Sequence, residues 1–129
     1  MESFVNLTII TEEIFVKNNF LADGEFKIEP FVSREIGCIS QENRQYYTRL
    51  IFELKNESDK PFPIDLKIAL KGEFDLTNVV EEETDEFLKH QAVQILFPYL
   101  RTMVSNITSS AMMSPIVLPV IDVFKWFPD

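Results

Sequence analysis

The sequence contains one cysteine, one histidine and three glycines among 129 residues. A single cysteine cannot form an internal disulfide, and one cysteine with one histidine does not make a zinc-binding pattern. With so few glycines, the sequence has no glycine-rich loop of the kind that binds phosphate groups. Catalysis needs an activated nucleophile or paired acid and base groups, and the sequence offers neither. We therefore expect no enzyme activity, no metal and no cofactor.

The single cysteine and the single histidine both have structural interpretations. Cys38 lies in the segment EIGCIS, which has no cationic side chain to activate a thiol, so we expect it to be buried or half-buried. His90 follows Lys89 on the polar side of a predicted helix. We expect His90 to be exposed to solvent rather than to act as a general base.

The sequence is also short of positive charge and of long apolar runs. It has 12 basic and 21 acidic residues, a formal net charge of −9, and no basic stripe. Nucleic acids and anionic membranes bind basic surfaces, so neither is an expected partner. No apolar run approaches the roughly 18 residues that span a membrane, and the N-terminus lacks the features of a signal peptide. We expect one domain over residues 1–129, located in the cytoplasm.

The first three-fifths of the sequence show the alternation of apolar and polar residues that is typical of strands with one buried face. The alternation is longest over residues 62–76 and continues upstream over residues 45–55. Residues 56–61 between them are typical of a turn, so these two strands should form an antiparallel hairpin. Residues 26–38 predict a further strand that bends or lies at an edge near Pro30. A first strand should begin near Val5 and extend to Phe15, followed by a loop that contains Phe20 and Leu21.

A long helix is predicted to begin near Thr84, with Thr84 as its N-cap. On a helical wheel, residues 87–111 show two apolar stripes about 100° apart. The first stripe consists of Val93, Leu96, Phe97, Leu100, Val104 and Ile107. The second stripe consists of Leu88, Ala92, Ile95, Tyr99 and Met103. Pro98 falls on the polar side, where a kink lets the helix bend around a twisted sheet.

The first stripe is expected to cover the sheet, and the second needs a partner of its own. In so small a chain, that partner could be the same helix of a second copy. The alternative is that both stripes form one wide face on the core of a single chain. The C-terminal tail is apolar and contains three prolines. A short helix is predicted there from Asp122, with Phe124 and Phe127 on one face and Trp126 pointing elsewhere.

Particular residues in this order of elements give the chain a resemblance to a known family. The run Leu96-Phe97-Pro98-Tyr99, with Arg101 two residues later, is the most specific motif. Residues 118–120, LPV, are followed by spaced phenylalanines, and Gly72 and Phe74 lie near the end of the fourth strand. With these motifs the chain resembles the SecB-type protein-export chaperones. Close identity is confined to the last third of the chain.

The resemblance implies an α+β fold. Its expected form is a four-stranded antiparallel Greek-key sheet, with a long kinked helix and a short C-terminal helix packed on one face. The resemblance also implies a homotetramer, a dimer of dimers in which the long helices pack between sheets through the second stripe. The function implied is that of an ATP-independent holdase, which binds non-native polypeptide clients in apolar grooves.

Two groups of side chains would line those client-binding grooves. The first group consists of Phe15, Phe20, Leu21 and Phe26, and the second of Val120, Phe124, Trp126 and Phe127. Export members of the family bind a translocation motor through acidic residues, but two of the matching positions are Lys17 and Lys67 here, which argues against motor contact. Two other functions stay open: a dedicated antitoxin-linked chaperone, and a SecB-like fold that serves as an assembly or ligand-binding module.

Overall fold

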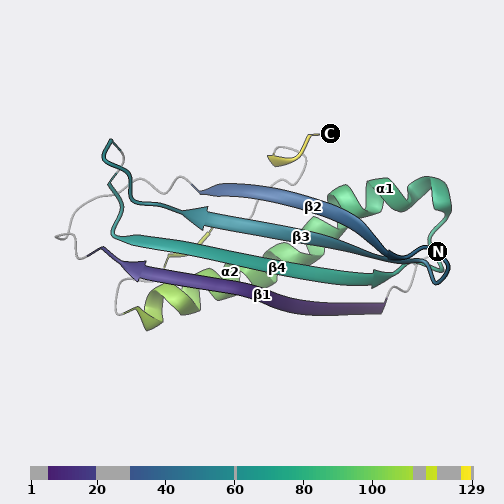
Figure 1. Ribbon diagram of the computed structural model, residues 1–129, viewed down its shortest axis with the longest axis horizontal. Helices are drawn as coiled ribbons and strands as arrows, with labels where there is room; N and C mark the ends of the chain where they lie inside the picture. Colours follow the sequence, from purple (N-terminus) through teal and green to yellow (C-terminus); the bar gives the residue numbers. More distant parts are fainter. Residues whose placement is uncertain (1–5, 20–29, 60, 112–115, 119–125, 129) are drawn as a thin grey trace.

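The computed structural model describes residues 6–19, 30–59, 61–111, 116–118 and 126–128. Four strands form one antiparallel sheet with the order β1-β4-β3-β2 (Figure 1). The strands are β1 (Asn6–Asn18), β2 (Phe31–Ser40), β3 (Gln45–Leu54) and β4 (Ile64–Asp75). Since β2, β3 and β4 follow one another and β1 lies beside β4, the predicted Greek-key order is confirmed.

The strand boundaries follow the alternation in the sequence. β3 and β4 lie within the two longest alternating segments, and their predicted antiparallel pairing is confirmed. β2 begins directly after Pro30, because proline has no N–H to donate to the ladder. β1 continues three residues beyond Phe15, paired with β4 up to Asn18 opposite Ile64.

Cys38 is exposed, so the prediction that its thiol is at least half-buried is wrong. The residue lies on β2, an edge strand of the sheet, directly before an irregularity in the pairing with β3 between Cys38 and Ser40. An edge strand has a neighbour on one side only, and the irregularity ends the regular alternation of faces. The alternation that placed this side chain inside therefore does not hold at the end of the strand.

One long helical segment crosses a single face of the sheet (Figure 1). It comprises η1 (Glu81–Glu83), α1 (Thr84–Glu86), the π-helical turn η2 (Phe87–Gln91) and α2 (Ala92–Ser110). The predicted start near Thr84 is confirmed, but its capping role is not, because Glu83 holds the N-cap position of α1 and the Thr84 hydroxyl donates to the carbonyl of Val80. The buried Thr84 hydroxyl accepts a hydrogen bond of 2.8 Å from Arg44, which also donates to the carbonyl of Val79.

The π-helical turn is held by side chains of the sheet. In this turn the N–H of Ala92 donates to the carbonyl of Phe87, five residues earlier. Thr48 on β3 donates to the carbonyl of Leu88 at 2.8 Å, and Arg34 on β2 donates to the carbonyl of Lys89 at 2.7 Å. These bonds fix the turn against the sheet by satisfying its main-chain oxygens.

The core lies between the sheet and α2. The first apolar stripe is confirmed, since five of its residues are buried and Ile107 packs against the same cluster. At Gly72 on β4, a Cβ atom would lie 2.8 Å from Leu96 Cδ2 and 3.0 Å from the Phe74 ring. The absence of that atom lets α2 approach the sheet closely. Pro98 is exposed, as predicted. Most of the predicted C-terminal helix lies outside the described residues.

Candidate functional site

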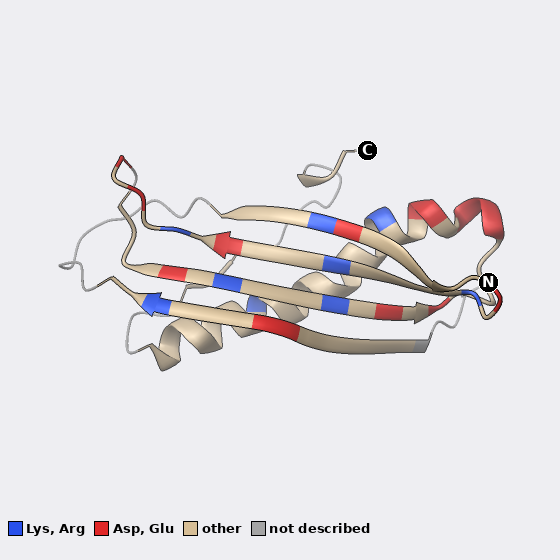
Figure 2. Cartoon of the chain, in the orientation of Figure 1, with Lys and Arg blue, Asp and Glu red and all other residues tan. Residues whose placement is uncertain are grey.

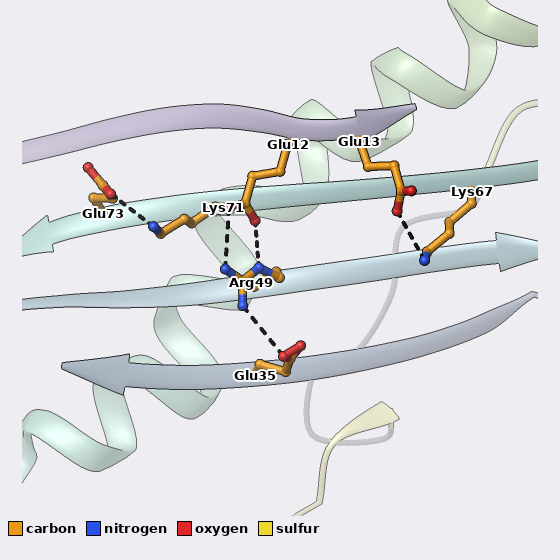
Figure 3. Close-up of polar contacts among 7 residues, drawn as sticks. All are labelled: Glu12, Glu13, Glu35, Arg49, Lys67, Lys71 and Glu73. Carbon is orange, nitrogen blue, oxygen red and sulfur yellow. Dashed lines mark hydrogen bonds and ion pairs between the residues drawn. The ribbon is translucent and has the colours of Figure 1, made fainter. Parts of the chain in front are cut away.

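Charged residues are distributed along all four strands (Figure 2), and on the face of the sheet turned away from the helix their side chains form ion pairs (Figure 3). Arg49 on β3 binds Glu12 on β1 and, at 3.4 Å, Glu35 on β2. Lys67 binds Glu13 at 3.0 Å (Figure 3). An irregularity in β1 between Thr11 and Glu13 allows both consecutive glutamates to reach cations on this face.

These ion pairs shift the protonation of the groups involved. The hydrogen bond from Arg49 lowers the pKa of Glu12, and the same bond raises the pKa of Arg49 above its ordinary value. The carboxylate of Glu13 likewise raises the pKa of Lys67. Neighbouring cations thus compensate the carboxylates of Glu12 and Glu13, so this part of the face is not a strongly acidic surface.

β1 exposes apolar side chains on both faces. The exposed side chains are Leu7 (36%), Ile10 (38%), Ile14 (51%), Phe15 (51%) and Val16 (39%). Ile14 lies opposite the buried Ile68, on the helix side, whereas Phe15 lies opposite Lys67, on the charged side. α2 covers the inner face of β1 only in part, because it packs mainly against β3 and β4. Apart from Phe15, the sequence analysis did not predict these residues as an exposed surface. Adjacent apolar residues in a strand do indicate apolar side chains on both faces.

The predicted client-binding residues are only partly within the described chain. Phe15 is exposed and borders an open cavity of about 250 Å³ beside the end of the β3–β4 hairpin. Phe20, Leu21, Phe26, Val120 and Phe124 lie outside the described residues.

Trp126 and Phe127 are half-buried and pack on the core. The Trp126 ring meets that of Phe97 edge to face at 5.5 Å, and the Arg34 guanidinium lies 4.6 Å above the Phe127 ring. The structure thus keeps these two aromatic residues of the tail on the same side of the molecule as α2, and away from Phe15 on the opposite face of the sheet.

Part of the polar side of α2 contacts the tail, while Gln94, Pro98 and Thr102 on the same side face solvent. Arg101 Nε donates to the carbonyl of Leu118 at 2.9 Å, and Ser105 Oγ donates to that of Ile116 at 3.0 Å. The N–H of Ile116 donates to Thr108 Oγ1 at 2.9 Å. The polar residues at this helical spacing, followed by an apolar tail, were the sequence feature that could have indicated docking of the tail. The pattern alone does not show whether water or main-chain groups of the tail bind these side chains.

His90 is 3% exposed, so the prediction of a solvent-exposed histidine is wrong. Its Nε2 atom lies 2.8 Å from the carbonyl oxygen of Phe127, and its Nδ1 atom lies 2.7 Å from Glu86 Oε1. The described part of the tail covers the side of the ring that was expected to face water.

The residues of the second apolar stripe differ in their exposure to solvent. Leu88 and Ala92 are 3% and 0% exposed within the chain, so in this conformation they offer no surface to a second copy. They lie in and directly after η2, whose wider turn departs from the 100° per residue on which the predicted stripe depends. Ile95 and Met103 are half-buried, and Tyr99 is 51% exposed. Thr11 Oγ1 on β1 lies 3.8 Å from the Met103 sulfur, which places this part of α2 beside β1.

The described residues contain neither a cluster of metal ligands nor a helix that could span a membrane. In this part of the chain, no group of three or more His, Cys, Asp or Glu side chains could hold a metal ion. None of the described helices is long and apolar enough to cross a membrane.

Two known proteins are similar to this chain in sequence. An uncharacterized protein, MJ0357, of Methanocaldococcus jannaschii is 28% identical over 104 residues, which cover 78% of this chain and 66% of the relative. The protein-export protein SecB of a Ruegeria species is 32% identical over 84 residues, 64% of this chain and 51% of the relative. The chain thus spans between half and two thirds of the length of these relatives.

A solved structure shares the fold. It is the Mycobacterium tuberculosis Rv1957 SecB-like chaperone in complex with a ChAD peptide from the Rv1956 HigA1 antitoxin. The TM-score is 0.72 at 14% identity, with 92% of this chain and 91% of the other covered. This likeness confirms the predicted α+β fold. The family model for SecB, preprotein translocase subunit SecB, matches residues 14–128. Since that match takes in most of the sequence, with the end of β1, all of β2, β3 and β4, and the helix, the chain belongs to the SecB family, as its motifs predicted.

Proposed function

We propose that this protein is an ATP-independent holdase that binds unfolded or partly folded polypeptides. The observation that carries the proposal is the apolar surface of β1, where five large side chains are 36–51% exposed. An edge strand with such a surface promotes association unless a partner covers it. Membership of the SecB family supports non-native polypeptide as one of the partners.

The proposed client surface has two parts. Phe15, with Phe20, Leu21 and Phe26, forms one part, and Val120, Phe124, Trp126 and Phe127 form the other. Apolar burial supplies about 25 cal/mol per Å² before the cost of ordering the client is subtracted. Binding by many weak apolar contacts needs no nucleotide and no chemical step.

A dedicated client fits the chain better than the translocation motor. Lys17 and Lys67 stand at positions where acidic residues would be needed for motor contact, and Lys67 also compensates Glu13. The solved relative from Mycobacterium tuberculosis was bound to a peptide from an antitoxin. We propose that this chain serves one partner protein of that kind, as a homotetramer built from two dimers.

An aggregation assay without nucleotide tests the proposal. The protein should suppress aggregation of a chemically denatured client, and Phe15→Gln should lower the protection severalfold. Phe31→Gln is the matched control, because Phe31 is 65% exposed but lies on the opposite edge strand. A native pull-down with mass measurement of the complex should identify the client and the number of subunits.

The half-buried Trp126 and Phe127 favour a second candidate, a SecB-like module for assembly or ligand binding that has no chaperone role. Its expected signs are a monomeric mass and low binding of an apolar dye by the native protein. Absence of protection for every denatured client, together with an empty pull-down, would reject the holdase in favour of this module.

A further inference from the structure

His90 joins the helix to the aromatic end of the tail. The ring is 3% exposed, and each of its two nitrogen atoms lies within hydrogen-bonding distance of one oxygen. Nδ1 faces the carboxylate of Glu86 at 2.7 Å, and Nε2 faces the main-chain carbonyl of Phe127 at 2.8 Å. This contact adds to the packing of Trp126 on Phe97 and of Phe127 under Arg34.

Both oxygen atoms accept hydrogen bonds and cannot donate them while the carboxylate is ionised. A neutral imidazole donates from one nitrogen only, whereas an imidazolium donates from both. The arrangement is therefore complete only when His90 is protonated. When the ring loses a proton, it must give up its bond either to Glu86 or to the tail.

Among the described residues, the charged groups around the ring come from two elements. On the helix, Glu86 is in direct contact with His90, and Lys89 is engaged in an ion pair with Asp85 at 2.9 Å. On β2, the guanidinium of Arg34 lies over the Phe127 ring and opposes a positive charge on His90. The ionised carboxylate of Glu86 is a stronger acceptor than the main-chain carbonyl of Phe127, so a neutral ring keeps its single N–H on Nδ1 and loses the bond from Nε2 to the tail.

We propose that His90 is a proton-controlled latch that holds the tail aromatics Trp126 and Phe127 on the core when it is protonated and loosens them when it is neutral. Histidine changes its charge between about pH 5 and 8. Loss of one hydrogen bond from a charged donor weakens docking of the tail about tenfold. The latch regulates part of the proposed client surface and to that extent rests on the proposed holdase function.

Trp126 reports the latch directly, because it is the single tryptophan of the chain. In the full-length protein without a client, quenching of tryptophan fluorescence by acrylamide should rise severalfold between pH 5 and 8, and the emission maximum should move to longer wavelength. His90 is also the single histidine, so no other imidazole contributes to a step in this range.

Two variants separate the latch from a general loosening of the fold. Glu86→Gln should keep the tail docked across the range without a step, because an amide can either donate to or accept from Nδ1. His90→Gln should also lack the step. Circular dichroism of both variants verifies that the helix and sheet are retained. A wild-type signal that is flat from pH 5 to 8, or a step that persists in Glu86→Gln, overturns the latch.

An aggregation assay at both ends of the pH range keeps the latch apart from the holdase function. Protection that is greater at pH 8 than at pH 5 agrees with release of client-binding aromatics. A fluorescence step without protection at any pH supports the latch and rejects the holdase function. Protection without a fluorescence step supports the holdase function and rejects the latch.

Discussion

Glu12 and Arg49 connect distant strands of the sheet through a pair of side chains. Glu12 lies on β1 and Arg49 on β3, so their ion pair crosses β4, and Glu35 extends it to β2 (Figure 3). The Arg49 and Glu12 side chains are 23% and 32% exposed, so water screens the pair in part. A contribution of up to about 1 kcal/mol to the free energy of unfolding is expected from such a pair.

The pH dependence of this contribution follows from the direction of the shift. Arg49 lowers the pKa of Glu12 in the folded chain below the ordinary value of 4.5. The stabilisation is therefore present above about pH 4.5 and is lost as the pH falls through the lowered pKa. Glu12→Gln should reduce the free energy of urea-induced unfolding at pH 7, and the difference from wild type should disappear near pH 2.

A double-mutant cycle isolates the pair from the rest of the face. In an Arg49→Met background, Glu12→Gln should have little effect at either pH. An equal effect of Glu12→Gln with and without Arg49 would show that the glutamate acts through another group.

At the scale of the elements, the close packing of α2 on the sheet depends on Gly72 of β4. Gly72 lies under Leu96 of α2, and a Cβ atom there would come within 2.8 Å of Leu96 Cδ2 and 3.0 Å of the Phe74 ring. Leu96 and Phe74 are 0% and 1% exposed, so neither can move into solvent. Gly72→Ala should lower the free energy of unfolding by about 1–3 kcal/mol, as overpacking of a core does.

Gly37→Ala is a suitable comparison for this measurement. Its Cβ atom would come within 2.6 Å of the Tyr47 ring atoms, but Tyr47 is only half-buried and has room to shift. Urea denaturation should show the smaller loss for Gly37→Ala. Equal losses in the two variants would argue against Gly72 as the position that sets the distance between helix and sheet.

The sheet could be predicted almost completely from the sequence, whereas the helix could not. The alternation over residues 62–76 has a direct cause, since successive side chains of a strand point to opposite faces. The turn η2 has no local signature, because Thr48 and Arg34 hold it from strands about 40 and 55 residues earlier in the chain. A wheel with a constant 100° per residue therefore misplaced Leu88 and Ala92.

The candidate site was predicted less well for a related reason. A helix face with Arg101, Ser105 and Thr108 has the same pattern whether water or a docked tail satisfies it. For the same reason His90 was expected in solvent, although Phe127 covers it. Phe15 was expected at the client surface from the resemblance to the SecB family, and the structure places it on the exposed charged face.

At the scale of the whole molecule, one apolar strip has no partner within the described chain. It joins the helix-side residues Leu7, Ile14 and Val16 of β1 to Tyr99 on α2, with Met103 beside Thr11. The strip runs along an edge strand whose outer main-chain groups have no neighbouring strand within the sheet. A second copy of the chain could cover this helix-side strip and the edge together, which agrees with the proposed homotetramer and leaves Ile10 and Phe15, on the charged face, for the client.

Substitution within this strip should change the oligomeric state. Ile14→Glu and Tyr99→Glu each introduce a charge at a side chain that is 51% exposed in the single chain, so the fold can accept it. In an interface the same charge would be buried without a partner, which costs several kcal/mol. Both variants should therefore dissociate to smaller species in light scattering coupled to size-exclusion chromatography. Val117→Glu, at a side chain that is 69% exposed beyond α2, should keep the wild-type mass. A wild-type mass for both strip variants would mean that the copies meet elsewhere, and the apolar strip of β1 would then be left for the client.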